Sequence, residues 1–359
     1  MVHSLPRLAD WASLELELAP LPLVILANLG LTRAWARTMT TFALVLSALW
    51  LGIIGVSAIA TAGSAVSAGR SGLVMLYTAM AMGAVLVPFL RRSLTSILPF
   101  DPDNPVHLTA LSLSLALIGV VIAGQIAVNT LAPSNQAPPL ERVDLFLQSL
   151  PFLLIALIGV GIFLRRSPRA ALERLGFVRP APWQVLLGLA SAGLLVAVNF
   201  GFGALASYLT PTLNHQVDIA STKVFSHVSD PTSFILQALL AGICEEAFFR
   251  GALQPRLGLV VASVTFAILH TEYGLSIDIV AVFVLALGLG VIRRYANTTT
   301  SAITHVTHNL VVSIVASINV VAALFYSAIG VETAMVLVLV GFWVWTRRRG
   351  AEAPTQEPV

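Results

Sequence analysis

The sequence predicts an all-α protein, a polytopic integral membrane bundle of about ten transmembrane helices. Of its 359 residues, 57% are hydrophobic and only 10% are charged, at a mean hydropathy of +0.89, whereas an average soluble domain carries roughly 25% charged residues. Apolar runs near the bilayer-spanning length of about 20 residues recur along the chain. The single cysteine, Cys244, excludes an internal disulfide framework and a cysteine-rich zinc module. These observations exclude a soluble fold.

Arg, Pro and Gly residues divide the apolar runs into ten predicted spans. In chain order these cover residues 39–62, 71–90, 106–130, 145–164, 183–209, 231–253, 257–271, 274–292, 300–322 and 325–346. The seventh is the weakest, because it is short and interrupted by Gly258. The segment from Leu18 to Leu31 is also apolar, but it is short and contains Pro20 and Pro22. We expect it to lie at the interface or to re-enter the membrane.

The basic residues, 19 Arg and Lys223, mark the sides of the membrane and do not predict a nucleic-acid partner. With a cytoplasmic N-terminus and ten spans, 16 of the 20 fall on the cytoplasmic side and only Arg70, Arg142 and Lys223 on the other. Arg250 falls inside a span. This asymmetry predicts a multi-pass protein of the plasma (inner) membrane, in contact with the lipid bilayer, with both termini cytoplasmic.

Four regions follow from this division of the chain. Residues 1–38 form the N-terminal interfacial segment, and 39–182 a four-helix membrane region that ends in the basic stretch 165–182. Residues 183–349 form the membrane domain that carries the polar motifs, which lie within 231–325. The last ten residues, 350–359, are polar and contain proline, with the sequence GAEAPTQEPV. We expect them to form a disordered cytoplasmic tail.

Ionisable residues inside a span are costly and therefore indicate function. The sixth span contains Glu245, Glu246 and Arg250 within AGICEEAFFRGAL. Glu246 and Arg250 are four residues apart, so they share a helix face and can form a supporting ion pair. Glu245 points about 100° away from Glu246 and has no partner in its own helix. We therefore expect Glu245 to be the reactive carboxylate.

Two later spans offer polar partners for Glu245. The seventh ends at His270, one turn after Phe266 on the same face, and the ninth carries His305 and Asn309 on one face. His308 faces elsewhere and is either a packing residue or an alternative partner. Counted from a cytoplasmic turn near Pro255 and Arg256, Glu245 and His270 lie about 15 and 20 Å deep. His305, counted from Arg294 and the polar run 297–300, lies at a similar depth of roughly 10 to 16 Å.

A carboxylate and two imidazoles on three helices can activate water, bind a metal or relay protons. Glu245, His270 and His305 match a ligand set of catalytic zinc, although no HExxH motif is present. Without metal, Glu245 could act as general base on a water oriented by His270, with His305 and Asn309 stabilising an oxyanion. A thiol nucleophile at Cys244 is a further alternative, but no base is fixed beside it.

In this region the chain resembles the CPBP intramembrane proteases, the family of type II CAAX prenyl endopeptidases and of bacteriocin-processing or self-immunity proteins. Three ordered motifs carry the resemblance: EExxxR at Glu245, Glu246 and Arg250, FxxxH at Phe266 and His270, and HxxxN at His305 and Asn309. The approach RLGFVRPAPWQVLLGL is similar to the lead-in of bacterial members. The motifs cover about residues 231–325, and the first four spans match nothing we can name.

The resemblance implies an all-helical intramembrane endopeptidase that opens to the cytosol and cleaves a membrane-associated protein or peptide. It assigns Glu245 as the base, His270 as its partner, His305 and Asn309 as the oxyanion hole, and Glu246, Arg250 and Phe266 as support. Family members were long regarded as metalloproteases, so zinc remains an alternative. Two other hypotheses stay open, namely a proton-coupled transporter that relays through Glu245, His270 and His305, and a non-catalytic immunity or scaffold protein. The preference for Arg over Lys and the Ala-rich spans suggest a GC-rich prokaryotic source.

Overall fold

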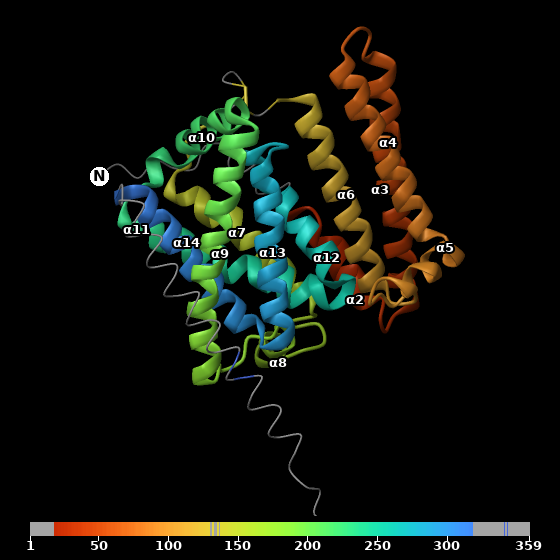
Figure 1. Cartoon of the computed structure of the whole chain (residues 1–359). Coiled ribbons are helices and arrows are strands. Elements are labelled where there is room, and N and C mark those ends of the chain that lie inside the picture. Colours follow the sequence, from red (N-terminus) through yellow and green to blue (C-terminus); the bar gives the residue numbers. More distant parts are fainter. Residues whose placement is uncertain are drawn as a thin grey trace, which may run out of the picture.

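The protein folds into a bundle of α-helices, seen in a computed structural model that describes residues 18–129, 131–132, 135, 137–318, 341 and 343 (Figure 1). These residues contain no β-strand, and Ile162 and Arg166 form an isolated bridge. The all-α membrane fold is therefore confirmed. The predicted tenth span and the predicted tail lie outside the described residues, apart from positions 341 and 343.

Six helices make up the N-terminal part of the described chain. They are α2 (Leu21–Leu29), α3 (Ala34–Thr61), α4 (Val66–Leu86), α5 (Pro88–Ser93), α6 (Pro105–Ala127) and α7 (Arg142–Gly159). At nine residues α2 is too short to cross a bilayer, which agrees with a non-spanning role. It packs against α3, α6 and α7.

The second part carries the predicted motifs. It consists of α8 (Pro168–Leu175), α9 (Pro182–Leu209), α10 (Pro211–Phe225), α11 (Pro231–Leu240), the π-helix η3 (Ala241–Leu253), α12 (Gln254–Ile268), α13 (Ile277–Tyr295) and α14 (Thr298–Ile318). The 15-residue α10 follows α9 after a single residue, in a stretch where the sequence predicted only a loop. Its composition is too polar for a span, so the search for apolar runs missed it.

Six helices in the described part of the chain are long and apolar enough to cross a membrane. They are α3, α4, α6, α7, α9 and the continuous stretch 231–268 formed by α11, η3 and α12. Each of the first nine predicted spans coincides with a helical segment, but α13 and α14 are not among these six helices. The count of ten is therefore not confirmed.

The stretch 231–268 bends back on itself at Gly258. This glycine has φ 86° and ψ 172°, a conformation that residues with a Cβ rarely adopt. The rings of Phe249 and Phe266 lie 5.0 Å apart, whereas 17 residues of straight helix would span about 25 Å. The turn predicted near Pro255 and Arg256 therefore lies at Gly258, two residues further along the chain. The helix continues through both residues, because the N-terminal position of α12 accommodates a proline that donates no hydrogen bond.

Prolines and polar caps start the helices around the candidate site. Pro182 and Pro231 occupy the first turns of α9 and α11, where a missing backbone N–H costs nothing. The Asp230 carboxylate accepts hydrogen bonds from the backbone N–H groups of Thr232 and Ser233 at the start of α11. The local sequence thus sets where the motif-bearing helices begin.

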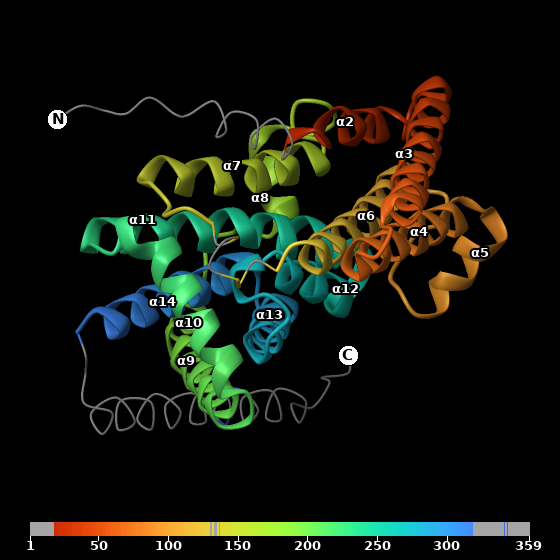
Figure 2. The same ribbon diagram turned by 90° about the horizontal axis from the view of Figure 1, so that it is seen from above.

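The helices pack in layers with the motif-bearing stretch in the middle. In Figure 2, α11, η3 and α12 lie between α7 on one side and α13 and α14 on the other. Helices α3 and α4 form the edge of the bundle, and α6 joins them to α12 (Figure 1). The main buried cluster links these layers through Leu44, Leu111, Phe249, Leu257 and Phe266.

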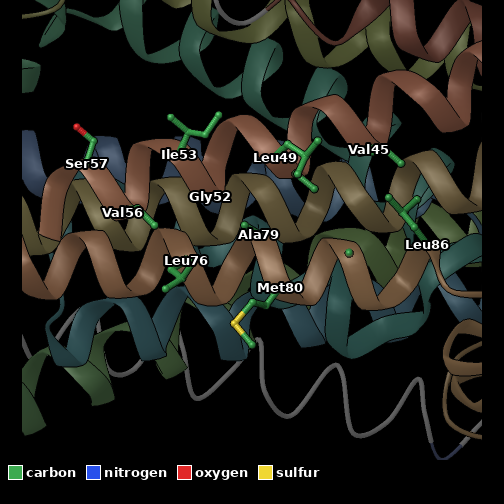
Figure 3. A pocket seen from close by; sticks show the side chains of 12 residues that line it. Val45, Leu49, Gly52, Ile53, Val56, Ser57, Leu76, Ala79, Met80 and Leu86 are labelled. Carbon is green, nitrogen blue, oxygen red and sulfur yellow. The ribbon is translucent and has the colours of Figure 1, made fainter. Parts of the chain in front are cut away.

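A groove of about 720 Å³ lies between α3 and α4 (Figure 3). Its lining is apolar apart from Ser57 and contains none of the predicted site residues. Because α3 and α4 lie at the bundle edge, this groove faces the surroundings of the protein and offers no group for chemistry.

Candidate functional site

The site forms where η3 packs closely against α14. A Cβ added to Gly242 would lie 2.5 Å from Cγ2 and 2.9 Å from the backbone nitrogen of Val306. Only a glycine at this position lets the two helices approach so closely. Since η3 is a π-helix, with the N–H of Gln254 bonded to the carbonyl of Phe249 five residues earlier, its side chains follow a different rotation from that assumed for an α-helix.

Glu246 is the centre of a fully buried polar network. Its side chain is 0% exposed, with Oε2 3.5 Å from Nε of Arg250 and Oε1 3.3 Å from Nδ1 of His305. Oγ of Ser301 donates a hydrogen bond of 2.5 Å to Oε2 and also contacts the carbonyl of Leu289. The predicted pair of Glu246 and Arg250 is thus present, and this network ties η3 to α14.

Arg250 is buried among aromatic rings and makes no hydrogen bond through its guanidinium to any described residue. Its Cζ lies 4.8 Å from the ring centroid of Phe266 and 5.9 Å from that of Phe249. The negative faces of the rings and the Glu246 carboxylate therefore supply the attraction that compensates for desolvation of the cation.

Glu245, the predicted base, has a free carboxylate oxygen. Its Oε2 is buried and has no hydrogen-bond partner among the described residues. The carboxylate interacts electrostatically with His305 and His270. A buried acceptor without a donor costs about 1 to 3 kcal/mol, so this oxygen is an unusual feature that requires an explanation.

His270 lies just beyond the end of α12, and its ring is fixed by local contacts. Its Nδ1 is 3.1 Å from the backbone carbonyl of Phe266, and its ring centroid is 4.8 Å from the Phe266 ring and 6.3 Å from the stacked Tyr273 ring. A carbonyl can only accept, so Nδ1 carries the proton in this contact. In the neutral ring Nε2 then keeps its lone pair and can accept a proton or hydrogen bond.

His305 is held in the same way by a different acceptor. Its Nδ1 faces Oε1 of Glu246, and its ring lies 5.8 Å from that of Phe266. Phe266 therefore contacts both histidines. The carboxylate accepts from Nδ1, which leaves Nε2 of His305 as the nitrogen available for chemistry.

Asn309 is paired with its neighbour His308. Nδ1 of His308 lies 3.2 Å from Oδ1 of Asn309. The amide oxygen accepts this bond, so the amide NH2 of Asn309 remains as a donor. His308, which the sequence predicts to be a packing residue or an alternative partner, contacts Asn309.

The predicted zinc ligands do not fit a metal. No group of three or more His, Cys, Asp or Glu side chains in the described part of the chain is arranged to hold a metal ion. Of the predicted ligands, His305 already contacts Glu246 through Nδ1. Cys244 is buried beside Glu245, and no described base pairs with it.

Sequence reasoning missed Ser301 and Tyr273. Ser301 precedes His305 by four residues and so shares its helix face, a signal that was present in the sequence. Tyr273 follows His270 in the short 3-10 turn η4 (Thr271–Tyr273), and nothing in the spacing indicates that it stacks on that histidine.

Comparison with known protein families bears directly on this network. Residues 228–311 match the Rce1-like family, described as type II CAAX prenyl endopeptidase Rce1-like. The chain carries an Rce1-like domain. This domain runs from just before α11 into α14 and includes every predicted site residue from Glu245 to Asn309. Searches of curated proteins and of solved structures find no match. The Rce1-like match supports membership of the CPBP family, a membrane protease family, as the three motifs suggested.

Proposed function

We propose that this Rce1-like protein is an intramembrane endopeptidase that hydrolyses a peptide bond with a water activated by Glu245 and His270. One observation carries the proposal: the buried Oε2 of Glu245 has no hydrogen-bond donor among described residues. His305 and His270 act electrostatically on the same carboxylate. An unpartnered carboxylate oxygen is suited to accept a proton from water. The family match supports hydrolysis over a proton-coupled transporter.

In the first step the Glu245 carboxylate takes a proton from a water molecule, whose oxygen attacks the carbonyl carbon of the peptide. The Nε2 lone pair of His270 accepts a hydrogen bond from the other O–H of that water, which stays on the attacking oxygen, and so orients the water. The attack gives a tetrahedral oxyanion. Protonated Glu245 then returns its proton to the leaving nitrogen as the carbon–nitrogen bond breaks, which restores the carboxylate.

The oxyanion needs donors, and Asn309 and His305 can supply them. The amide NH2 of Asn309 is free because its oxygen is held by His308. His305 can donate from Nε2 only when both ring nitrogens carry protons, since Nδ1 donates to Glu246. In that form the Glu246 carboxylate offsets the imidazolium charge, and Ser301 and Arg250 hold the carboxylate in place. Removal of one such donor typically reduces kcat by about 10² to 10³.

We infer that the substrate is a membrane-associated protein or peptide, because the network lies within helices of a membrane bundle. The plasma-membrane location, the cytoplasmic termini and a site open to the cytosol belong to the same proposal and rest on the arginine distribution. The prokaryotic source likewise remains a compositional prediction.

The test uses the full chain purified in detergent and incubated with a peptide library. Wild type is compared with Glu245→Gln, which keeps the shape of the side chain, and with His270→Gln. We expect cleavage to fall by about 10² to 10⁴ in each variant, without loss of folding. Cleavage by Glu245→Gln at the wild-type rate would refute the mechanism.

Two matched variants control for surface substitution. Glu173→Gln and His215→Gln change the same residue types on exposed helices, and we expect wild-type cleavage from both. A chelator leaves cleavage unchanged in this mechanism, so chelator-sensitive cleavage restored by zinc would contradict it.

A further inference from the structure

Five arginines gather at one end of the bundle, outside the site described above. We call them the arginine cluster: Arg165, Arg166, Arg174, Arg256 and Arg293. They come from the loop after α7, from α8, from the start of α12 and from the end of α13. Arg174 interacts electrostatically with each of the other four and is therefore the centre of the cluster.

Part of the cluster has a structural role at the C-terminus of α7. Nη2 of Arg256 donates to the carbonyl of Gly159 at 3.1 Å, and Arg166 donates to the carbonyl of Val160. Arg165 donates to Oδ1 of the buried Asn28, whose amide also contacts the last turn of α7. These bonds satisfy helix carbonyls that have no partner within the helix, and the positive charges match the negative end of the helix dipole.

The helix dipole compensates only a small part of this charge. A helix C-terminus carries about half an elementary charge, and no carboxylate forms an ion pair with any of the five among described residues. Arg174 has no hydrogen-bond or ion-pair partner in the described part of the chain. Burial first, and the guanidinium of Arg166 second, lower its pKa from the usual value. Repulsion within the cluster is therefore uncompensated.

Three arginines elsewhere in the described part of the chain have acidic partners. Arg91 lies 3.4 Å from Asp103, Arg142 lies 3.0 Å from Asp230, and Arg169 lies 3.0 Å from Glu173. The preference for basic residues on one side of a membrane explains why arginines occur in such loops. It does not explain why five from separate segments converge without a single acidic partner.

The cluster lies at the ends of helices, where a membrane protein meets the headgroup region. The last turns of α7 and α13 and the first turns of α12 and α14 come together here, with Thr298 bonded to the carbonyl of Leu175 at the end of α8. Figure 1 shows α8 at the end of the bundle where α13 finishes. Arginine guanidinium groups bind phosphate oxygens through paired N–H donors, and basic pockets between helix ends bind anionic lipid headgroups.

We propose that the arginine cluster is a binding site for a phosphate group, with the headgroup of an anionic phospholipid as its expected source. The phosphate lies against Arg174, whose guanidinium has all its donors free. The arginines that cap α7 contribute their remaining N–H groups and their charge. Binding there would offset the repulsion among the five cations and fasten α7, α8, α12 and α13 together at the membrane surface.

The test uses the full chain in a non-ionic detergent and follows thermal unfolding by tryptophan fluorescence. Mixed micelles that contain phosphatidylglycerol are compared with micelles that contain phosphatidylcholine, and inorganic phosphate is titrated separately. A ligand that binds only the folded state raises the unfolding midpoint in a saturable way. We expect this rise with phosphatidylglycerol and not with phosphatidylcholine.

Arg174→Gln is the decisive variant, and Arg169→Gln on the same helix is its control because Arg169 is exposed and paired with Glu173. We expect Arg174→Gln to weaken phosphatidylglycerol binding by roughly fivefold, equivalent to about 1 kcal/mol, and Arg169→Gln to leave it unchanged. Without lipid, Arg174→Gln should unfold no earlier than wild type, because Arg174 has no partner to lose.

Each result decides the proposal. Saturable stabilisation by inorganic phosphate alone supports the site and assigns it to a soluble phosphate compound. No stabilisation by either phosphate source would overturn it. Equal weakening by Arg169→Gln and Arg174→Gln would also overturn it, because the attraction would then be general to the charged surface. Peptide cleavage is not measured in this experiment, so its outcome is independent of the proposed hydrolysis.

Discussion

Substitution of Gly242 by alanine provides a direct test of how the bundle assembles its polar network. Gly242 lies where η3 and α14 make their closest approach, one turn before Glu246. The added Cβ would lie 2.5 Å from Cγ2 of Val306 and 2.9 Å from its backbone nitrogen. Neither atom belongs to a flexible chain end, because valine is branched at Cβ and the nitrogen is part of α14. The helices must therefore move apart.

Two opposing effects determine the free energy of unfolding of this variant. Alanine is favoured over glycine within a helix by about 1 kcal/mol. Overpacking a close contact costs typically about 1 to 3 kcal/mol. A return to an ordinary contact near 3.5 Å requires a displacement of about 1 Å, and a shift of that size can reduce catalysis by about 10². We expect net destabilisation of about 1 kcal/mol and a much larger relative loss of cleavage.

The assay combines thermal unfolding in detergent with peptide cleavage by the same preparation. Gly201→Ala is the matched control, because Gly201 lies within α9 and a Cβ there meets no atom within 4 Å. This control should be at least as stable as wild type and fully active. If Gly242→Ala unfolded at or above the wild-type midpoint and cleaved normally, the close approach would not matter and the reasoning would be wrong.

Four further predictions concern the polar groups. Glu246→Gln should lower the free energy of unfolding by about 3 to 5 kcal/mol, because it leaves the Arg250 cation buried without its counter-charge. Glu245→Gln should cost little stability, since Oε2 has no donor to lose. Ser301→Ala should cost about 1.5 to 3 kcal/mol, since its hydroxyl donates to a carboxylate. Acid should destabilise the start of α11. The hydrogen bond from Ser233 first, and Arg142 second, lower the pKa of Asp230 in the folded protein. The ionised carboxylate therefore stabilises the fold above the unfolded pKa of about 4, and this contribution is lost as the pH falls below it.

Chemical unfolding in detergent measures the effects of the three substitutions, and amide hydrogen exchange at the first turn of α11 measures the effect of acid. Equal stability of Glu246→Gln and Glu245→Gln would contradict the division of the two carboxylates into a supporting and a free group. Ser301→Ala with wild-type stability would show that its hydrogen bond is dispensable. Asp230→Asn should remove the acid dependence of exchange, and its persistence in that variant would assign it to another group.

Much of the fold could be read from the sequence because apolar runs have a fixed length requirement in a bilayer. The segments at α3, α4, α6, α7 and α9 were predicted to within about five residues, because each contains a long apolar run. The chain reversal was misplaced from Gly258 to the neighbouring Pro255 and Arg256. Both residue types often end a helix, but proline also fits a first turn, and Arg256 is buried because its guanidinium bonds to the carbonyls of Ala252 and Gly159.

For the candidate site, spacing predicted the pairings that lie within one helix. The ion pair of Glu246 with Arg250 and the ring contact of Phe266 with His270 both follow from a separation of four residues. Spacing could not show that His305 contacts Glu246 in place of Glu245, or that Ser301 completes the network. Those contacts cross between helices, and their choice depends on the rotation of η3 and on the close approach at Gly242.

The sequence by itself determined that this protein is a helical membrane bundle and which side chains are candidates for chemistry. Both conclusions follow because placing a charged side chain inside a bilayer costs free energy, so spans contain few charges and a charge inside a span indicates function. Only the tertiary structure decided which carboxylate is held and which has a free oxygen. The two glutamates are adjacent and chemically identical, and they differ only because Glu246 faces Arg250, Ser301 and His305 while Oε2 of Glu245 faces no donor among described residues.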